Sequence, residues 1–187
     1  MKKNYAGFSV IELMVVVAIA AILVALAAPS FVKLIRSTSI ASAVNTFMAD
    51  ARFARSEAVR LGGAVVMCRS DAPEAANPSC GTGSGPNGNG WVSGWIVFKD
   101  LDNNGAKDSA DPLLRVQSPI TSVNSIVDSV STKLVFTATG RLKSLSSGTK
   151  TLQFGSAPDF SNEVQRVVCV SLGGRVRIAG DGYTSCS

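Results

Sequence analysis

The chain has 187 residues, a formal net charge of +5 and no histidine. Without histidine it has no histidine general base, no Ser-His pair and no histidine-rich zinc site. Because no other catalytic constellation is present, we expect a protein that is not an enzyme and needs no cofactor. The charge is uneven: residues 1–61 carry +4, residues 62–111 carry −3 and residues 112–187 carry +4. Positive charge toward both ends of the chain favours a polyanionic partner.

The N-terminus begins with a basic leader, residues 1–7, and continues with an apolar run of 21 residues from Phe8 to Ala28. This run is long enough to cross a bilayer as a helix, and the two leader lysines would stay on the cytoplasmic side. A secretory signal peptide cleaved near residues 25–27 is the alternative. Glu12 argues against it, because a carboxylate at membrane depth is costly and indicates a function.

The helix is expected to continue past Pro29 as far as Leu61. Apolar residues spaced alternately by four and three mark one face of an amphipathic helix, namely Ile40, Val44, Phe47, Ala51, Ala54, Ala58 and Leu61. A helix from Phe8 to Leu61 has 54 residues and would be about 80 Å long. We expect residues 8–29 to lie in a membrane or a filament core, and residues 30–61 to pack under a sheet.

The remainder, residues 62–187, has the pattern of a β-rich domain. Apolar runs between Gly, Ser and Asn clusters predict strands at 64–68, 91–98, 113–116, 133–137, 151–154, 166–172 and 175–178. Residues 71–90 are rich in Pro, Asn, Gly and Ser, a composition that predicts a long polar loop. Trp91 and Trp95 would share one face of a strand and pack in the core. The predicted fold class is α+β, with one long helix followed by an antiparallel sheet packed on its C-terminal half.

Four cysteines are present, an even number that suits two disulfides in an exported chain. Three pairings are possible. We favour Cys68–Cys80 and Cys169–Cys186, because each pair closes a short loop. A zinc site is not indicated, since the chain has neither a CxxC pair nor histidine.

Residues 100–111 form an Asp-rich loop that matches the EF-hand type of calcium loop at Asp100, Asp102, Asn104, Gly105, Asp108 and Asp111. The last of these stands where the usual ligand is Glu, a strand precedes the loop, and Pro112 follows it in place of a helix. The alternative is a polar hairpin loop in which Asn-Gly and Asp supply turn chemistry. We therefore expect no metal and keep calcium as the second possibility.

Two short basic motifs follow glycines in the C-terminal part of the chain. In GRVR, Arg175 and Arg177 are two residues apart, so on a strand both point to the same face. Arg141 and Lys143 have the same spacing in GRLK, and Lys133 and Lys150 would add charge if the fold brings them near. Guanidinium groups on one rigid face suit phosphate oxygens. The alternative is a solvated strand whose charges discourage aggregation.

The N-terminal segment GFSVIELMVVVAIAAILVALAAPSF resembles the N-terminus of type IV pilins and type II secretion pseudopilins. The resemblance implies that a prepilin peptidase in the inner membrane cuts between Gly7 and Phe8 and methylates Phe8. Glu12 then becomes the fifth residue of the mature chain, and Pro29 matches the family's helix-bending proline. Glu12 would pair with the Phe8 amine of a neighbouring pilin subunit, which sets the register of assembly because an unpaired charge at low dielectric is costly.

The segments ARSEAVRLGGAVVMCRSD, GWVSGWIVFKDLDNNG, LVFTATGRL and VVCVSLGGRVRIA resemble the GspH/FimT branch of pilin-like proteins, over nearly the whole mature chain. The resemblance implies a pilin-like fold. GspH is a minor pseudopilin of type II secretion, and FimT is a minor pilin linked to DNA capture in natural transformation. DNA-competent members of the FimT branch carry a GRxR element near the C-terminus.

These observations favour a FimT-type minor pilin that binds double-stranded DNA non-specifically through Arg175, Arg177, Arg141 and Lys143 and supports DNA uptake. Such a protein would lie in the bacterial inner membrane before assembly, and in the periplasm and the cell-surface pilus afterwards. A structural pseudopilin of type II secretion is the alternative. A further alternative is a pilus-assembly initiator whose basic surface meets acidic partner subunits.

Overall fold

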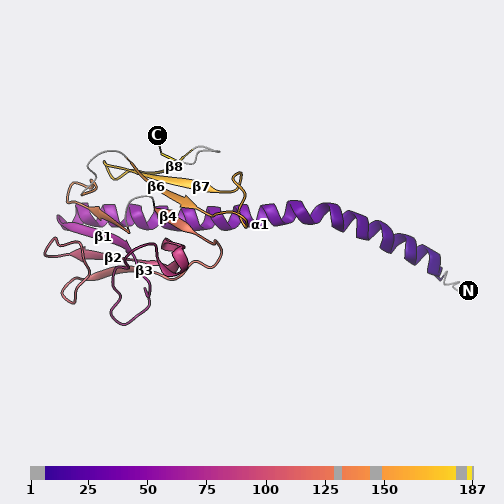
Figure 1. Cartoon of the computed structure of the whole chain (residues 1–187), viewed down its shortest axis with the longest axis horizontal. Coiled ribbons are helices and arrows are strands. Elements are labelled where there is room, and N and C mark those ends of the chain that lie inside the picture. The colour runs from indigo at the N-terminus through magenta and orange to yellow at the C-terminus, as the bar shows by residue number, and fades with distance from the viewer. Residues whose placement is uncertain (1–6, 129–131, 144–148, 180–184, 187) are drawn as a thin grey trace, which may run out of the picture. The chain divides into compact units, whose positions relative to one another are not determined.

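A computed structural model describes residues 7–128, 132–143, 149–179 and 185–186. The chain divides into two compact units, Met1–Arg36 and Ser37–Ser187. One continuous helix, α1 (Val10–Leu61), supplies the described helix of the first unit and the central helix of the second (Figure 1). The expected long helix is therefore present, with Pro29 inside it.

The start of α1 is fixed by a reciprocal pair of hydrogen bonds. The Ser9 hydroxyl oxygen accepts the Glu12 N–H at 3.3 Å, while the Glu12 carboxylate accepts the Ser9 N–H at 2.9 Å. This capping box satisfies two backbone donors that a helix start otherwise leaves unpaired. The helix consequently begins at Val10, two residues later than the sequence pattern predicts.

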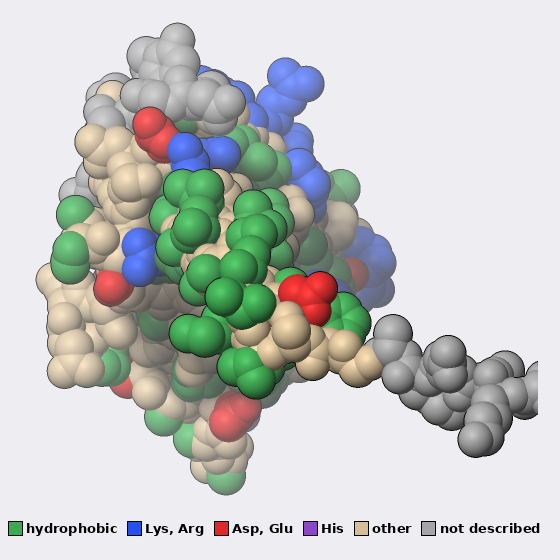
Figure 2. All heavy atoms as spheres, turned by 90° about the vertical axis from the view of Figure 1, so that its right-hand side faces the viewer, with side chains coloured by type: hydrophobic (Ala, Val, Ile, Leu, Met, Phe, Trp, Pro, Cys, Tyr) green, Lys and Arg blue, Asp and Glu red, His purple; other side chains and the backbone are tan. Residues whose placement is uncertain are grey.

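The first unit contains the apolar segment that the sequence assigns to a membrane. An 18-residue window of α1 near the N-terminus has a mean hydropathy of 3.0 and is not buried, so by length and composition it could cross a membrane. Figure 2 shows hydrophobic side chains gathered along this part of the helix. Exposed apolar surface on this scale indicates a lipid or protein environment.

The second unit is built around the C-terminal half of α1. The apolar stripe predicted from the sequence is buried from Ile40 to Ala58. Phe47 lies at its centre, with ring centroids 5.4 Å from Trp91, 5.5 Å from Trp95 and 5.7 Å from Phe154 in edge-to-face geometry. Both tryptophans are core residues, as expected, although Trp91 belongs to a 3-10 turn (Trp91–Ser93) and not to the strand.

In the described part of the chain, two four-stranded antiparallel sheets cover this half of the helix, where the sequence pattern predicts one sheet (Figure 1). The first has the order β3-β2-β1-β5, with β1 (Ala64–Arg69), β2 (Trp95–Asp100), β3 (Leu113–Gln117) and β5 (Lys133–Phe136). The second has the order β4-β6-β7-β8, with β4 (Ile126–Asp128), β6 (Thr149–Phe154), β7 (Arg166–Ser171) and β8 (Val176–Ile178). Strand β4 is not predicted, because three residues among polar neighbours give no periodic signal.

The two sheets are joined beside α1. Leu142, which bridges to Phe136 of the first sheet, donates its N–H to Leu172 O at the end of the second, at 2.9 Å. The Lys150 ammonium of β6 donates to Lys133 O of β5, also at 2.9 Å. The segment that follows β5 therefore lies against the turn that follows β7.

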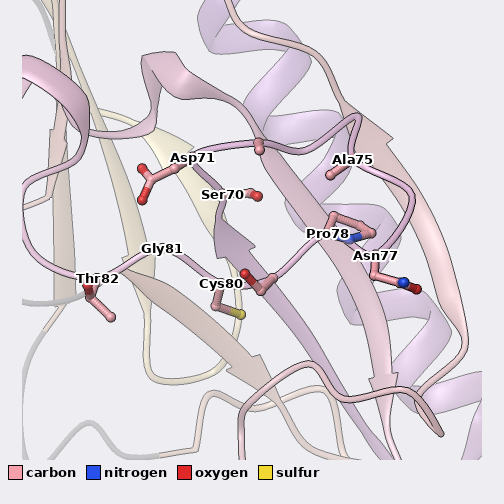
Figure 3. Close-up of a pocket in the computed structure, with 10 residues that line it drawn as sticks. Ser70, Asp71, Ala75, Asn77, Pro78, Cys80, Gly81 and Thr82 are labelled. Atoms are coloured by element: carbon pink, nitrogen blue, oxygen red, sulfur yellow. The ribbon is translucent and has the colours of Figure 1, made fainter.

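Both favoured disulfides are present, Cys68–Cys80 and Cys169–Cys186. The first anchors the loop that follows β1, which surrounds a small polar cavity of about 180 Å³ lined by Ser70 to Thr82 (Figure 3). Buried Arg69 holds this loop through an ion pair to Asp71 and a hydrogen bond of 2.6 Å to Thr82 O. These contacts hold the loop in its shape and so account for the cavity that the loop surrounds.

Candidate nucleic-acid interface

The β7–β8 turn presents the GRVR motif. Gly174 has a φ of 72° and donates its N–H to Ser171 O at 2.8 Å, while Ser171 donates back to Arg175 O at 3.0 Å. Val176 is buried, and Arg175 and Arg177 on either side of it are exposed. The alternation expected from the sequence is therefore present, and both guanidinium groups project from the outer face of the second sheet.

The turn after β5 presents the second basic motif in the same way. Gly140 has a φ of 72° and donates to Thr137 O at 2.8 Å, and Thr137 donates to Arg141 O at 2.8 Å. Leu142 is buried between the exposed residues Arg141 and Lys143. The two Gly-Arg motifs are thus turns of the same kind, one from each sheet.

The two turns contact each other. A Cβ atom on Gly174 would collide with the carbonyl oxygen of Gly140, so the backbones meet at a distance that only glycine allows. Arg141 and Arg175 each follow one of these glycines directly. Exposed arginines that are 34 positions apart in the sequence, Arg141 and Arg175, therefore follow two turns in contact. We call Arg141, Arg175 and Arg177 the Gly-Arg surface.

The lysines that the sequence associates with this surface also contact other parts of the chain. Lys143 donates to Asn103 O at 3.1 Å and Lys133 to Gly105 O at 2.7 Å, so both ammonium groups brace the Asp-rich loop. Lys150 was expected to add charge if the fold brought it near, and the fold does not present it on this surface. It is buried between the sheets, where desolvation lowers its pKa while nearby Asp128 acts in the opposite direction.

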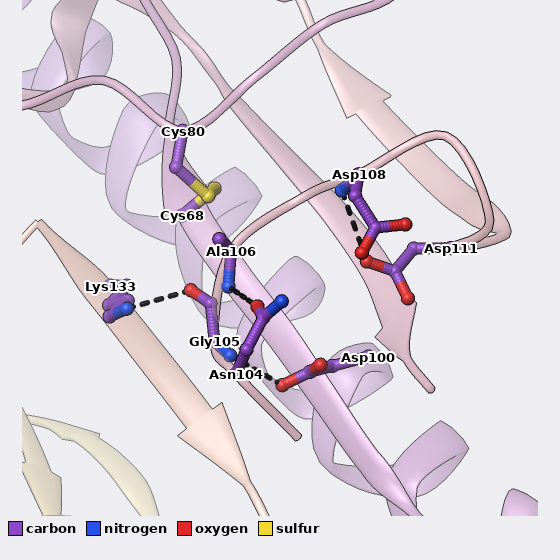
Figure 4. Close-up of a disulfide and its surroundings, with 9 residues drawn as sticks. All are labelled: Cys68, Cys80, Asp100, Asn104, Gly105, Ala106, Asp108, Asp111 and Lys133. Carbon is purple, nitrogen blue, oxygen red and sulfur yellow. Dashed lines mark hydrogen bonds between the residues drawn. A yellow bond between two sulfur atoms is a disulfide. The ribbon is translucent and has the colours of Figure 1, made fainter. Parts of the chain in front are cut away.

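The candidate calcium loop is closed by its own backbone N–H groups (Figure 4). Asp100 Oδ2 accepts Gly105 N–H at 2.9 Å, and the Asp111 carboxylate accepts Leu101 N–H at 2.9 Å and Asp108 N–H at 3.1 Å. The other predicted ligands accept Asx-type hydrogen bonds: Asp102 Oδ1 accepts Asn104 N–H, Asn104 Oδ1 accepts Ala106 N–H, and Asp108 Oδ1 accepts Ala110 N–H. Over the described residues, no group of three or more His, Cys, Asp or Glu side chains is placed to hold a metal ion.

Asp100 is the carboxylate of this loop whose pKa is shifted. It is buried, its Oδ1 has no hydrogen-bond partner in the described structure, and Asp102 and Asp111 lie nearby. Burial is the main cause that raises its pKa, and the two neighbouring carboxylates add to the effect.

The residues at which the sequence predicts cleavage and methylation lie at the start of the described chain. Gly7 and Phe8 are exposed just before α1, and residues 1–6 of the leader lie outside the described residues. Glu12, expected to act in assembly, is also the carboxylate of the capping box.

One arginine at this interface was not singled out from the sequence. Arg55 lies on the flank of the α1 stripe, and its side chain passes beside both Gly140 and Gly174. The helix period places it off the core face, which is typical of a solvated charge. Arg55 has these two glycines as neighbours because both turns pass over α1 at this point.

A helix with an apolar first segment, packed over its second half against antiparallel sheets, defines a pilin-like protein. The family model described as type II transport protein GspH matches residues 43–174, and a prokaryotic N-terminal methylation motif matches residues 2–28. The first match spans most of the chain, which therefore belongs to the GspH family, the minor pilins and pseudopilins of type IV pili or type II secretion.

Solved structures support the fold. Two crystal forms of the type IV minor pilin FimU from Pseudomonas aeruginosa strain PAO1 are similar to this chain. One has a TM-score of 0.56 and 19% identity, covering 80% of this chain and 96% of that one. The other has a TM-score of 0.50 and 21% identity, covering 78% and 98%. A search of curated proteins gives no match.

Proposed function

We propose that this chain is a FimT-type minor pilin of a type IV pilus that binds double-stranded DNA without sequence preference and supports its uptake in natural transformation. Arg141, Arg175 and Arg177 contact the DNA, and Lys143 contributes at the border of the surface. The observation that carries the proposal is the contact between the Gly140 and Gly174 turns. This contact supports a single basic surface that draws arginines from both sheets.

The chemistry of this surface suits phosphates. Each guanidinium carries a fixed fork of donors that matches phosphate oxygens, and its charge persists at every physiological pH. Neutralising DNA phosphates releases condensed counterions, so binding depends steeply on salt. Contacts to the backbone alone carry no sequence information, and the expected binding is therefore non-specific.

The N-terminal segment supplies the route to the filament. A prepilin peptidase cleaves between Gly7 and Phe8 and methylates Phe8, and the apolar half of α1 holds the subunit in the inner membrane until assembly. Glu12 then pairs with the Phe8 amine of a neighbouring subunit. After assembly the Ser37–Ser187 unit stands on the pilus in the periplasm and at the cell surface, where it meets DNA.

The second candidate is a structural minor pseudopilin of type II secretion. The description of the matched family model, type II transport protein GspH, favours it. In this role, or in that of a pilus-assembly initiator, the Gly-Arg surface meets solvent or acidic subunits and DNA has no part.

A DNA titration separates the candidates. We would titrate the full chain in an uncharged detergent with double-stranded DNA at about 50 and 200 mM salt, beside the Arg175→Gln/Arg177→Gln double variant. The minor-pilin proposal expects salt-sensitive binding that the double variant loses. Arg60→Gln is the charge control, because Arg60 is exposed on α1 and pairs with Glu57 at 2.6 Å. If the wild-type chain does not bind at the lower salt concentration, the structural pseudopilin becomes the better reading.

A further inference from the structure

We propose that the DNA surface extends onto α1, where Arg52 and Arg55 contact the phosphate backbone together with the Gly-Arg surface. This inference rests on the proposed function and adds a third segment to it. The resulting site joins residues 52–55, 141 and 175–177, which are far apart in the sequence. Its ligand is the phosphodiester backbone of double-stranded DNA.

The position of Arg55 ties the helix to both turns. A Cβ on Gly140 would lie 3.1 Å from Arg55 Nε, and a Cβ on Gly174 would lie 3.3 Å from Arg55 Cδ. The two glycines therefore leave room for the Arg55 side chain to pass beneath the turns. Arg55 is half-buried as a result. A guanidinium held by packing loses less freedom when it binds a phosphate than a mobile one does.

A hollow lies beside this contact on the surface of α1. It has a volume of about 420 Å³ and is lined by Arg52, Arg55, Ser56 and Val59. The Ser56 hydroxyl already donates to Phe53 O at 2.8 Å, so the two arginines are the cationic groups of its lining. Arg52 and Arg55 are three residues apart and thus lie on one helical face about 4.5 Å apart along the axis. The side chains of both arginines therefore border the same hollow.

Three arginines elsewhere in the chain are each held by a carboxylate. Arg60 pairs with Glu57, Arg69 with Asp71 and Arg115 with Asp50. In contrast, the side chains of four other arginines, two on α1 and two of the Gly-Arg surface, make no hydrogen bond or ion pair within the described ranges of the chain. This group is Arg52, Arg55, Arg141 and Arg175.

Gathering unpaired like charges costs free energy in the isolated protein. The fold nevertheless brings these four side chains to one region, from a helix and two turns. A bound polyanion offsets this repulsion, because each guanidinium then makes charge-assisted hydrogen bonds to phosphate. The same positive field accelerates the encounter with DNA. An acidic protein partner would also neutralise the charge, and the experiment below distinguishes it.

The test compares Arg52→Gln with Arg60→Gln in the full chain, in an uncharged detergent, with double-stranded DNA as the probe. Both changes remove one charge from an exposed arginine of α1. Loss of one phosphate contact should flatten the slope of log K against log salt by about 0.9 and weaken binding at about 50 mM salt roughly tenfold. Arg60→Gln should leave both quantities unchanged. Arg52→Lys, which keeps the charge, should retain the wild-type slope.

Each outcome bears on a different statement. If the wild-type chain does not bind DNA, the proposed function fails, and the basic surface must serve an acidic partner or solvent. If the wild type binds, the Arg175/Arg177 double variant binds weakly and Arg52→Gln behaves as Arg60→Gln, then only the extension onto α1 is overturned. Because Arg52 is exposed, circular dichroism should show unchanged folding for its variants. Arg55→Lys, which keeps the packed stem, repeats the test beneath the turns and should bind more weakly than wild type with the slope retained.

Discussion

The carboxylate of Asp50 on α1 accepts the indole N–H of Trp95 on β2 at 2.8 Å, although the two residues are 45 positions apart. Its other oxygen accepts the Arg115 guanidinium at 2.6 Å, and Arg115 in turn lies 4.0 Å from the centre of the Phe53 ring. Asp50 is buried on a helix otherwise lined by apolar residues. One carboxylate therefore fastens the helix to two strands of the first sheet.

The Asp50 relationship predicts a large loss of stability on substitution. Asp50→Ala leaves the buried Trp95 N–H unpaired and Arg115 without its anion, which should cost about 2–4 kcal/mol in the free energy of unfolding. Asp50→Asn keeps an acceptor for Trp95 and should cost less. Urea unfolding of the detergent-solubilised chain, followed by tryptophan fluorescence, measures both. Equal losses for the two variants would show that the indole hydrogen bond adds nothing.

The contact between the two turns predicts a sharp difference between adjacent glycines. Gly174→Ala places a Cβ against Gly140 O at a positive φ, and we expect it to cost about 1–3 kcal/mol. It should also weaken DNA binding, because it separates Arg141 from Arg175. Gly173→Ala is the matched control, since the nearest atom to its Cβ would be Ser171 Oγ at 3.9 Å. Thermal melts and DNA titration of both variants check the prediction. Identical behaviour of the two would contradict it.

The Asp-rich loop predicts a pH-dependent effect. Burial raises the pKa of Asp100, so its ionised form is the one that folding disfavours. Below the ordinary pKa of about 3.8 the carboxyl is protonated in both the folded and the unfolded state, and its contribution to stability is full. As the pH rises through the higher pKa of the folded state, the carboxyl ionises and that stability is lost. Asp100→Asn, whose amide oxygen can still accept Gly105 N–H, should therefore raise the melting temperature at pH 7. The gain should shrink toward pH 4.

Calcium provides the control for that loop. The carboxylates of Asp108 and Asp111 accept backbone N–H groups, and we expect the melting temperature of the wild-type chain to be the same with and without millimolar calcium. A calcium-induced rise that Asp100→Asn abolishes would instead establish the loop as a metal site. Such a result would assign the unpartnered Asp100 Oδ1 to the ion.

The sequence predicts the helix and most strands because their signals are local. The α1 stripe follows the helical period, and the strands around Met67, Val97 and Val168 are apolar runs bounded by turn residues. The burial of Lys150 also has a local signal. In β6 Lys150 stands two residues before Leu152 and four before Phe154, which face the core. The strand period alone therefore places Lys150 on the buried face.

Other features depend on contacts between distant segments and have no local signal. The charge of Asp50 suggests a solvent position, and only Trp95 and Arg115 explain its burial. The approach of Gly140 to Gly174 follows from the way the two sheets meet beside α1. For the candidate interface, the sequence therefore identifies Arg141 and Arg175 as candidates but cannot show that they share a surface, or that Arg55 lies beneath them.

Glu12 has two roles that separate variants can resolve. It completes the capping box with Ser9, and by the proposed function it also pairs with the Phe8 amine of a neighbouring subunit. Glu12→Ala removes both. Glu12→Gln keeps the capping geometry, because a glutamine at this position still reaches the Ser9 N–H, but it removes the charge. Ser9→Ala weakens the cap and keeps the charge.

If the charge directs assembly, Glu12→Ala and Glu12→Gln should both be cleaved by the peptidase and both fail to enter filaments. Ser9→Ala should assemble, since a lost helix cap costs only about 1 kcal/mol. Immunoblots of sheared filaments and of membranes measure incorporation and cleavage for each variant. Incorporation of Glu12→Gln at the wild-type level would assign Glu12 to capping alone. The unpaired charge in an apolar filament core would then cease to explain why a carboxylate interrupts this segment.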